Sequence, residues 1–154
     1  MIESLLGWLT GAAPHGSEGP QDGLQLALTA LLVEAAHSGD HFDEGERAVI
    51  KQMLERRFKL SHDEARALLA AGEREAGRAA ELFHLTRVIN ERLSFEQRIE
   101  LVEMLWEVAY ADGVLDQYED SLLRRVSGLI YVPDRERGMA RQRVLGRLGL
   151  DATA

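Results

Sequence analysis

The sequence predicts an all-α fold of about seven helices in two halves related by pseudo-twofold symmetry. Apolar residues recur at helical spacing through residues 24–150, and helix-start signals precede these apolar stretches. No segment alternates polar and apolar residues as a half-buried strand does. With 154 residues and no cysteine, the chain is long enough to bury one core without disulfide bonds.

The start of the chain differs from the rest in composition. Its first nine residues are mostly apolar but contain no basic residue, which makes them a poor signal peptide. Residues 10–23 contain four glycines and two prolines, a composition typical of a flexible linker. We therefore expect a short apolar segment plus linker over residues 1–23 and one helical domain over residues 24–150.

Local signals place the helices in order. The first is expected from Leu24 to about Ser38, where Gly39 breaks it. Later helices begin at pairs with capping-box spacing, namely Asp43 with Glu46, Ser61 with Glu64, Ser94 with Gln97, and Asp116 with Glu119. A further helix between the second and third of these starts is marked by Leu82, Leu85, Val88 and Ile89. Pro133 suits the first turn of the last helix.

The two halves are predicted from an internal repeat. A shift of 73 residues superimposes six identical pairs, which are Leu28 and Leu101, Leu32 and Leu105, Glu34 and Glu107, Ala36 and Ala109, Asp43 and Asp116, and Glu46 and Glu119. These identities gather where the first helix of each half meets the second. A duplicated helix-loop-helix unit explains the pattern.

Carboxylates cluster at both of these junctions. The second junction carries Glu107, Asp112, Asp116 and Glu119, and the first carries Glu34, Asp40, Asp43 and Glu46. Hard divalent cations prefer such oxygen ligands, so calcium, magnesium or manganese is one interpretation. Capping of a helix start, with a glycine in the turn, is the other. His37 and His41 beside the first cluster extend the metal alternatives to zinc, although histidines at a helix end are more often ordinary surface residues.

No arrangement typical of an enzyme occurs in the sequence. Ser61, His62 and Asp63 are adjacent, but a helix start points consecutive side chains in different directions, so Ser61 is interpreted as a cap. The chain has no glycine-rich phosphate loop, no His-Glu-x-x-His helix and no Gly-x-Ser-x-Gly turn. We expect a protein without catalytic residues.

The charge and hydropathy of the chain argue against nucleic acid as a partner and against a membrane-spanning segment. With 26 acidic and 18 basic residues, the net charge of −8 repels nucleic acid. The arginines between residues 135 and 147 form a locally basic helix, interpreted as a solvated face rather than a docking site. No apolar run approaches the roughly 20 residues that cross a bilayer. We expect a cytoplasmic protein, with the inner face of the membrane as an alternative location that only the N-terminal segment would provide.

The junction sequences resemble those of the tellurite-resistance TerB family. The matching stretches are LLVEAAHSGDHFDEGERAVI (residues 31–50) and, as the most specific part, EVAYADGVLDQYE (residues 107–119). The resemblance implies seven helices in two pseudo-symmetric halves, no enzymatic activity, and a role in tellurite resistance or a related stress response. It also implies a metal site, with Asp112, Asp116 and Glu119 in the second motif, Asp43 and Glu46 in the first, and Glu34 and Glu107 beside them. Gly39-Asp40 reverses the family's Asp-Gly, so the second junction is the better candidate.

Two functional hypotheses follow from the sequence. The first is a metal-binding or metal-sensing module that passes a structural change to a protein partner. The alternative is a metal-free interaction scaffold that uses the N-terminal segment or the surface around Leu82, Phe83, Arg87 and Asn90. Either role requires a protein partner, whose identity the sequence does not give, and allows a homodimer.

Overall fold

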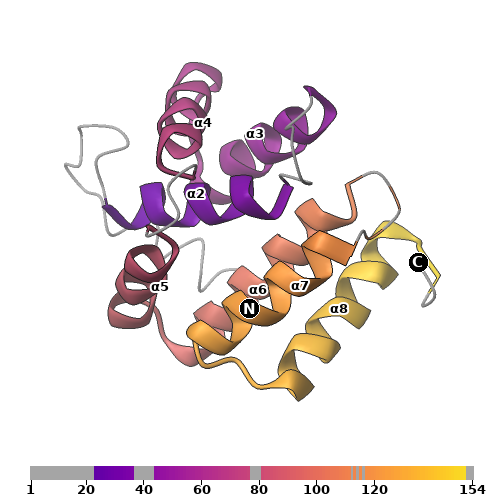
Figure 1. Cartoon of the computed structure of the whole chain (residues 1–154). Helices are drawn as coiled ribbons and strands as arrows, with labels where there is room; N and C mark the ends of the chain where they lie inside the picture. The colour runs from indigo at the N-terminus through magenta and orange to yellow at the C-terminus, as the bar shows by residue number, and fades with distance from the viewer. Residues whose placement is uncertain are drawn as a thin grey trace.

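The chain is all-helical over the residues that its computed structural model describes, which are 23–36, 44–76, 81–111, 113, 115 and 117–151 (Figure 1). Seven helices occur in this part: α2 (Gly23–Ala36), α3 (Glu44–Phe58), α4 (His62–Ala76), α5 (Glu81–Arg92), α6 (Phe95–Ala109), α7 (Gln117–Leu129) and α8 (Asp134–Leu148). None of the described residues is in a strand. The predicted all-α class and the expected number of helices are confirmed.

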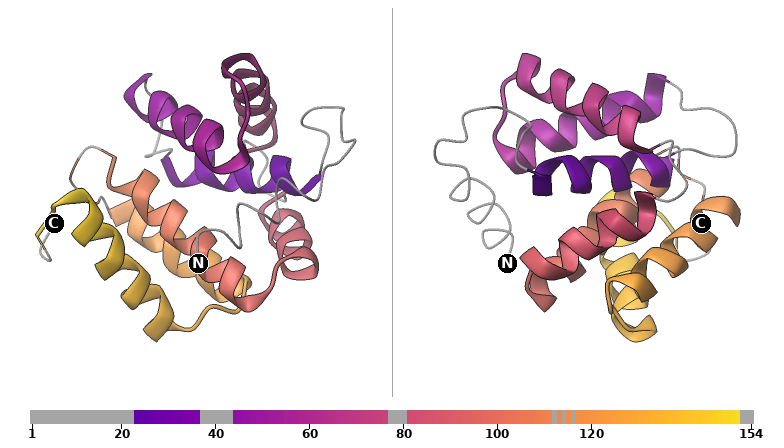
Figure 2. Two further views of the ribbon diagram at one scale, coloured as in Figure 1. Left: turned by 180° about the vertical axis from the view of Figure 1, so that it is seen from behind. Right: turned by 60° about the vertical axis from the view of Figure 1, so that its left-hand side comes forward.

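Helix α2 is the centre of the fold. Eleven of its fourteen residues are buried, because its sequence is apolar on every side. It packs against α4, α5 and α6, with smaller contacts to α3 and α7. Figure 2 shows α3 and α4 on one side of α2 and the remaining helices on the other. The positions of α3, α4, α5, α6 and α7 therefore depend on covering α2, whereas α8 packs on α6 and α7.

Helix α6 is the second buried helix, and α8 covers it. The Trp106 indole N–H donates to the Arg137 carbonyl across this interface at 3.1 Å. The rings of Trp106 and Tyr110 lie 6.0 Å apart, and the Arg141 guanidinium lies 5.9 Å and 5.8 Å from their centroids. Arg141 also donates to the Tyr110 hydroxyl at 2.8 Å. This stack of two aromatic rings and a guanidinium group, the aromatic seam, is one of the polar contacts between α6 and α8.

Two of the predicted capping boxes are confirmed. The Ser61 N–H donates to the Glu64 carboxylate at 2.8 Å, and the Glu64 N–H donates to the Ser61 hydroxyl at 3.1 Å. Ser94 and Gln97 make the same reciprocal pair at 2.8 Å and 3.2 Å. These bonds satisfy backbone donors that a helix start leaves without partners. Asp43 and Asp116, the caps predicted for α3 and α7, lie outside the described residues, and Pro133 precedes the first residue of α8 rather than lying within its first turn.

The order of helices repeats as the duplication predicts. After the shift of 73 residues, α2, α3 and α4 begin and end within two residues of α6, α7 and α8. Helix α5 connects the two triplets, and the positions that correspond to it in the first half, residues 8–19, lie outside the described residues. The helix boundaries support the repeat, and the pseudo-twofold relation between the halves stays a prediction.

Helices α3, α7 and α8 end in the same left-handed turn. A residue just after each helix has a positive φ. The value is 55° at Lys59 after α3, 59° at Tyr131 after α7 and 71° at Gly149 after α8. The N–H of the next residue then donates to a carbonyl five residues earlier, from Leu60 to Glu55, from Val132 to Ser127 and from Leu150 to Leu145. Such turns favour glycine because a Cβ strains them. Only α8 has glycine there.

Gly72 allows α4 to approach α2 closely, and this contact yields a first prediction. A Cβ at Gly72 would lie 2.6 Å from Thr29 Cγ2 and 3.3 Å from the Ala30 backbone nitrogen. Thr29 is fully buried, and its hydroxyl donates to the Gln25 carbonyl, so it has little room to move. We expect Gly72→Ala to lower the free energy of unfolding by about 1–3 kcal/mol in urea denaturation. Gly138→Ala on α8 meets no atom within 4 Å and should instead stabilise by up to about 1 kcal/mol. Equal effects of the two substitutions would contradict the close contact.

The strained end of α3 gives a second prediction. Lys59 is exposed and holds a φ that costs a non-glycine residue about 1 kcal/mol. Lys59→Gly should therefore raise the free energy of unfolding by about 0.5–1 kcal/mol, measured by thermal denaturation. Lys59→Ala removes the same side chain but keeps the Cβ, and it should give no gain. If alanine stabilises as much as glycine, backbone strain is not the cause.

Candidate functional site

The second junction connects the buried helix α6 to α7. The first residues after α6 form hydrogen-bonded turns, with the Ala111 N–H donating to the Val108 carbonyl and the Gly113 N–H to the Tyr110 carbonyl. Gly113 has a φ of 87°, a conformation that glycine adopts without strain. The predicted role of this glycine in the turn is confirmed. Asp112 and Asp116 lie outside the described residues, so their positions as metal ligands stay a prediction.

Glu119 is the carboxylate of this junction that the structure does place. It lies in the first turn of α7 and is only 5% exposed. A carboxylate near a helix N-terminus is stabilised by the backbone N–H groups and the helix dipole. Its counterpart Glu46 lies in the first turn of α3 and is half-buried. Both residues also take part in polar interactions, so neither is a free carboxylate.

The two glutamates that precede the junctions lie in the last turns of α2 and α6. Glu34 is half-buried and interacts with other groups. Glu107 faces three guanidinium groups, those of Arg56 at 3.8 Å, Arg57 at 3.9 Å and Arg147 at 3.9 Å. These positive charges balance Glu107 and would repel a metal ion near it.

The remaining predicted metal ligands lie outside the described residues. Asp40, Asp43, His37 and His41 all belong to residues 37–43, between α2 and α3. Within the described ranges, no three histidine, aspartate or glutamate side chains come together as a metal ion would require. The structure thus places Glu34, Glu46, Glu107 and Glu119, and it leaves the four aspartates as predictions.

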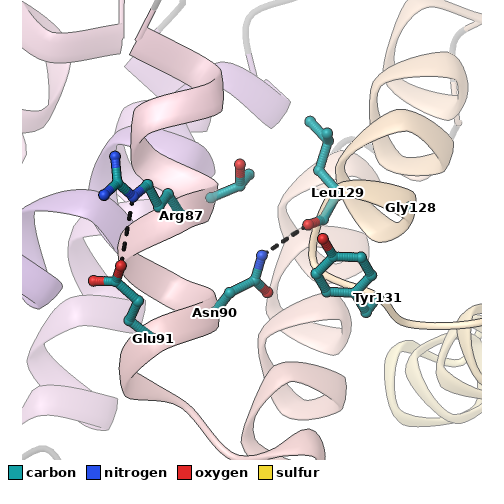
Figure 3. Close-up of a pocket in the computed structure, with 7 residues that line it drawn as sticks. Arg87, Asn90, Glu91, Gly128, Leu129 and Tyr131 are labelled. Atoms are coloured by element: carbon teal, nitrogen blue, oxygen red, sulfur yellow. Dashed lines mark hydrogen bonds and ion pairs between the residues drawn. The ribbon is translucent and has the colours of Figure 1, made fainter.

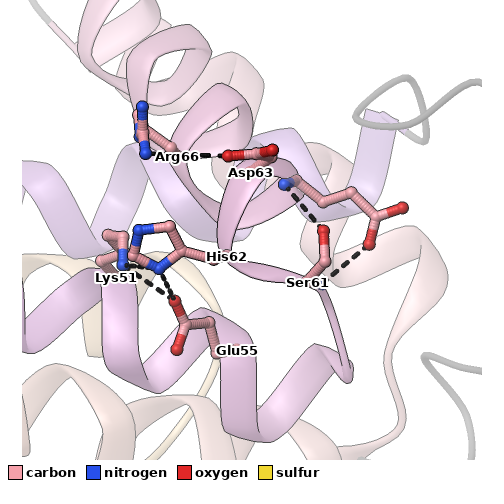
Figure 4. Close-up of polar contacts among 7 residues, drawn as sticks. Lys51, Glu55, Ser61, His62, Asp63 and Arg66 are labelled. Atoms are coloured by element: carbon pink, nitrogen blue, oxygen red, sulfur yellow. Dashed lines mark hydrogen bonds and ion pairs between the residues drawn. The ribbon is translucent and has the colours of Figure 1, made fainter.

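The serine, histidine and aspartate at the start of α4 do not form a triad (Figure 4). Ser61 is the cap described above, while His62 Nδ1 lies 2.8 Å from Lys51 Nζ and 3.3 Å from the Glu55 carboxylate. Asp63 instead pairs with Arg66 at 3.7 Å. The hydrogen bond from Lys51 lowers the pKa of Glu55. The interpretation of Ser61 as a cap is confirmed.

A surface pocket of about 300 Å³ lies between α5 and the end of α7, and we refer to it as the α5–α7 pocket (Figure 3). It is lined by Thr86, Arg87, Asn90, Glu91, Gly128, Leu129 and Tyr131. Arg87 and Asn90 belong to the surface that the sequence indicated for partner binding. The α7 residues were missed, because only the folded chain brings them beside α5.

The basic helix predicted near the C-terminus is α8, and several of its arginines stabilise the fold. Arg143 and Arg147 donate to the Glu103 carboxylate of α6 at 2.6 Å and 3.0 Å. Arg141 belongs to the aromatic seam, and Arg137 pairs with Asp134 at 2.6 Å. These side chains serve the contact with α6 and their own helix, so their charge is largely balanced.

No helix among the described residues is long and apolar enough to cross a membrane. The location of the protein in the cell stays a prediction.

The described residues define an all-helical module in which α5 joins two helix triplets. The second helix of each triplet, α3 or α7, has acidic residues in its first turn. A model of the family described as tellurite resistance protein TerB matches residues 25–142. The match covers most of the chain, which therefore belongs to the TerB family. No curated protein and no solved structure matches the chain.

The burial of Glu100 gives a prediction about how the stability of the fold depends on pH. Burial raises the pKa of Glu100, which precedes Glu107 on α6, above its ordinary value of 4.5. A raised pKa in the folded state means that ionisation opposes folding, so Glu100 costs stability as the pH rises through and above 4.5. Glu100→Gln should therefore raise the melting temperature at pH 7, and the gain should vanish at pH values well below 4.5.

The exposed Glu96 on the same helix provides a matched control. Glu96→Gln should give no gain in melting temperature at pH 7, because this side chain is in solvent. A gain for Glu100→Gln that is as large in acid as at neutral pH would contradict the role of burial.

Proposed function

We propose that this TerB-family chain binds a divalent cation at the junction between α6 and α7 and signals its occupancy to a protein partner. The process it serves is tellurite resistance or a related stress response, as the family description suggests. Two observations support the proposal: the close spacing of acidic residues in the sequence of the second junction and the burial of Glu119.

The burial of Glu119 is the observation that carries it. Removing a carboxylate from water costs several kcal/mol unless hydrogen bonds or a cation compensate. The start of α7 supplies backbone donors and Glu119 has polar interactions within the chain, so a cation would add to the compensation that these already give. Two further carboxylates, Asp112 and Asp116, lie within seven residues before Glu119 in the sequence. Three carboxylates brought together at this junction would repel one another, and a divalent cation would relieve this repulsion.

The donor set decides which cations suit the site. Asp112, Asp116 and Glu119 would hold the ion through carboxylate oxygens, which favours calcium, magnesium or manganese over zinc. Gly113, which lies between the first two of these residues in the sequence, has a positive φ that suits a tight turn. We leave Glu107 out of the proposed ligands because its carboxylate faces three arginines. A cation shared by the connection and α7 would tie the start of α7 to the end of α6.

Calorimetric titration tests the proposal with a double variant. The wild-type chain should bind one equivalent of calcium, magnesium or manganese saturably, and Asp112→Asn with Asp116→Asn should abolish this binding. At 100 times the dissociation constant, the cation should stabilise the fold by about 2.7 kcal/mol. Asp40→Asn with Asp43→Asn at the first junction is the matched control and should keep the binding, because the reversed Gly39-Asp40 order weakens that motif.

Two results would overturn the cation site. One is the lack of saturable heat with calcium, magnesium and manganese, together with a melting temperature that these ions do not change. The other is binding that survives the second-junction variant and disappears in the first-junction variant.

A second candidate function is a metal-free interaction scaffold, and the α5–α7 pocket favours it. The pocket presents polar groups and an aromatic ring at the surface, at the opposite end of α7 from the proposed cation site. The two functions are compatible, since a module that signals cation binding also needs a surface for its partner.

A further inference from the structure

We propose that the α5–α7 pocket binds an arginine side chain that a protein partner presents. This inference rests on the interaction role above and names the chemistry of the partner. It does not depend on the cation site, because α7 is about 20 Å long and the two sites lie at its opposite ends.

Tyr131 supplies an aromatic surface at the pocket (Figure 3). It is 71% exposed, the largest value among the exposed large apolar side chains of the described residues. Tyr131 shares its left-handed backbone with Lys59 at the end of α3 and differs from it in having an exposed aromatic ring. A guanidinium group stacks on such a ring through cation–π attraction.

Asn90 supplies a hydrogen-bond acceptor. Its amide nitrogen donates to the Leu129 carbonyl at 2.9 Å, and this bond fixes the orientation of the amide. The amide oxygen is then buried and has no hydrogen-bond partner among the described residues. A buried acceptor without a partner is unfavourable, and an N–H donor that displaced the side chains covering it would satisfy it. Arginine has five such donors and no acceptor.

The charges around the pocket also favour a cation. Glu91 on the rim pairs with Arg87 at 3.4 Å, but both side chains are more than 60% exposed, so this pair is weak and can be exchanged. Arg98, another nearby cation, is held by the carbonyls of Leu93 and Ile130 at 2.7 Å and 2.9 Å. The C-terminal end of α7 is negative through its helix dipole, and the whole chain carries a charge of −8.

The side chains and the size of the pocket favour arginine over lysine. A planar guanidinium can lie on the Tyr131 ring while its fork of N–H groups reaches a carboxylate such as Glu91. An ammonium group is a compact charge that neither stacks nor forks. The volume of about 300 Å³ is at the small end of ligand pockets, which suits one side chain rather than a large ligand.

Titration of the ¹⁵N-labelled full chain with the peptide acetyl-Gly-Arg-Gly-amide tests this inference. With EDTA present, the backbone amides of residues 86–91 and 128–131 should shift saturably. The matching citrulline peptide, which is neutral, and the glutamate peptide should shift these amides at least fivefold less at equal concentration. Lysine in place of arginine should give intermediate shifts.

Single substitutions in the pocket measure what each residue contributes to arginine binding. Tyr131→Gly removes the ring without adding backbone strain and should weaken arginine binding about fivefold, whereas Tyr131→Phe should keep most of it. Glu91→Gln should also weaken binding, and Arg87→Gln should strengthen it by removing a competing cation. Tyr118→Ala, which removes an exposed tyrosine at the other end of α7, is the control and should change nothing.

Arg87→Gln gives the sharpest outcome. If this variant loses peptide binding, or if the glutamate peptide binds better than the arginine peptide, the pocket selects anions and the inference is wrong. The absence of saturable shifts with all peptides would also overturn it. Because EDTA removes divalent cations, failure here leaves the cation titration unaffected, and failure of the cation titration leaves this result unaffected.

Discussion

The burial of α2 on all sides is the constraint on which the fold depends. A helix that is apolar around its whole circumference must be covered by several neighbours, and α4, α5 and α6 provide most of this cover. The approach of α4 is close enough that Gly72 cannot carry a Cβ without displacing Thr29. Helix α6, buried second, receives α8 and its arginines. Both functional candidates therefore lie at the edges of this packing, at the connection that follows α6 and beside the end of α7.

The charged side chains divide into those that the packing uses and those that remain for function. Arg47 and Glu73 join α3 to α4 through two hydrogen bonds at 3.0 Å and 2.9 Å, which raise the pKa of Arg47. In the second half, the arginines of α8 balance Glu103 and Glu107 of α6. Glu119 is buried at a helix start, has polar interactions within the chain, and follows Asp112 and Asp116 in the sequence. The cation proposal depends on this combination.

Much of the fold could be predicted from the sequence because the decisive signals are local. Capping residues such as Ser61 and Ser94 act within one turn, and the helical period of apolar residues extends over neighbouring turns. The candidate sites depend on distant contacts. Asn90 meets Leu129 only after α5 packs against α7. Likewise, the sequence grouped Glu107 with the junction aspartates, whereas the guanidinium groups it faces come from α3 and α8.

We propose that the second junction, and not the first, holds a divalent cation. Anomalous diffraction from crystals of the full chain grown with manganese tests it most directly, since Mn²⁺ has the same preference for oxygen ligands as calcium and magnesium. We expect one strong peak at the α6–α7 junction, at about 2.0–2.6 Å from a Glu119 carboxylate oxygen. A manganese-saturated crystal with no peak there, or with its peak between α2 and α3, would contradict it.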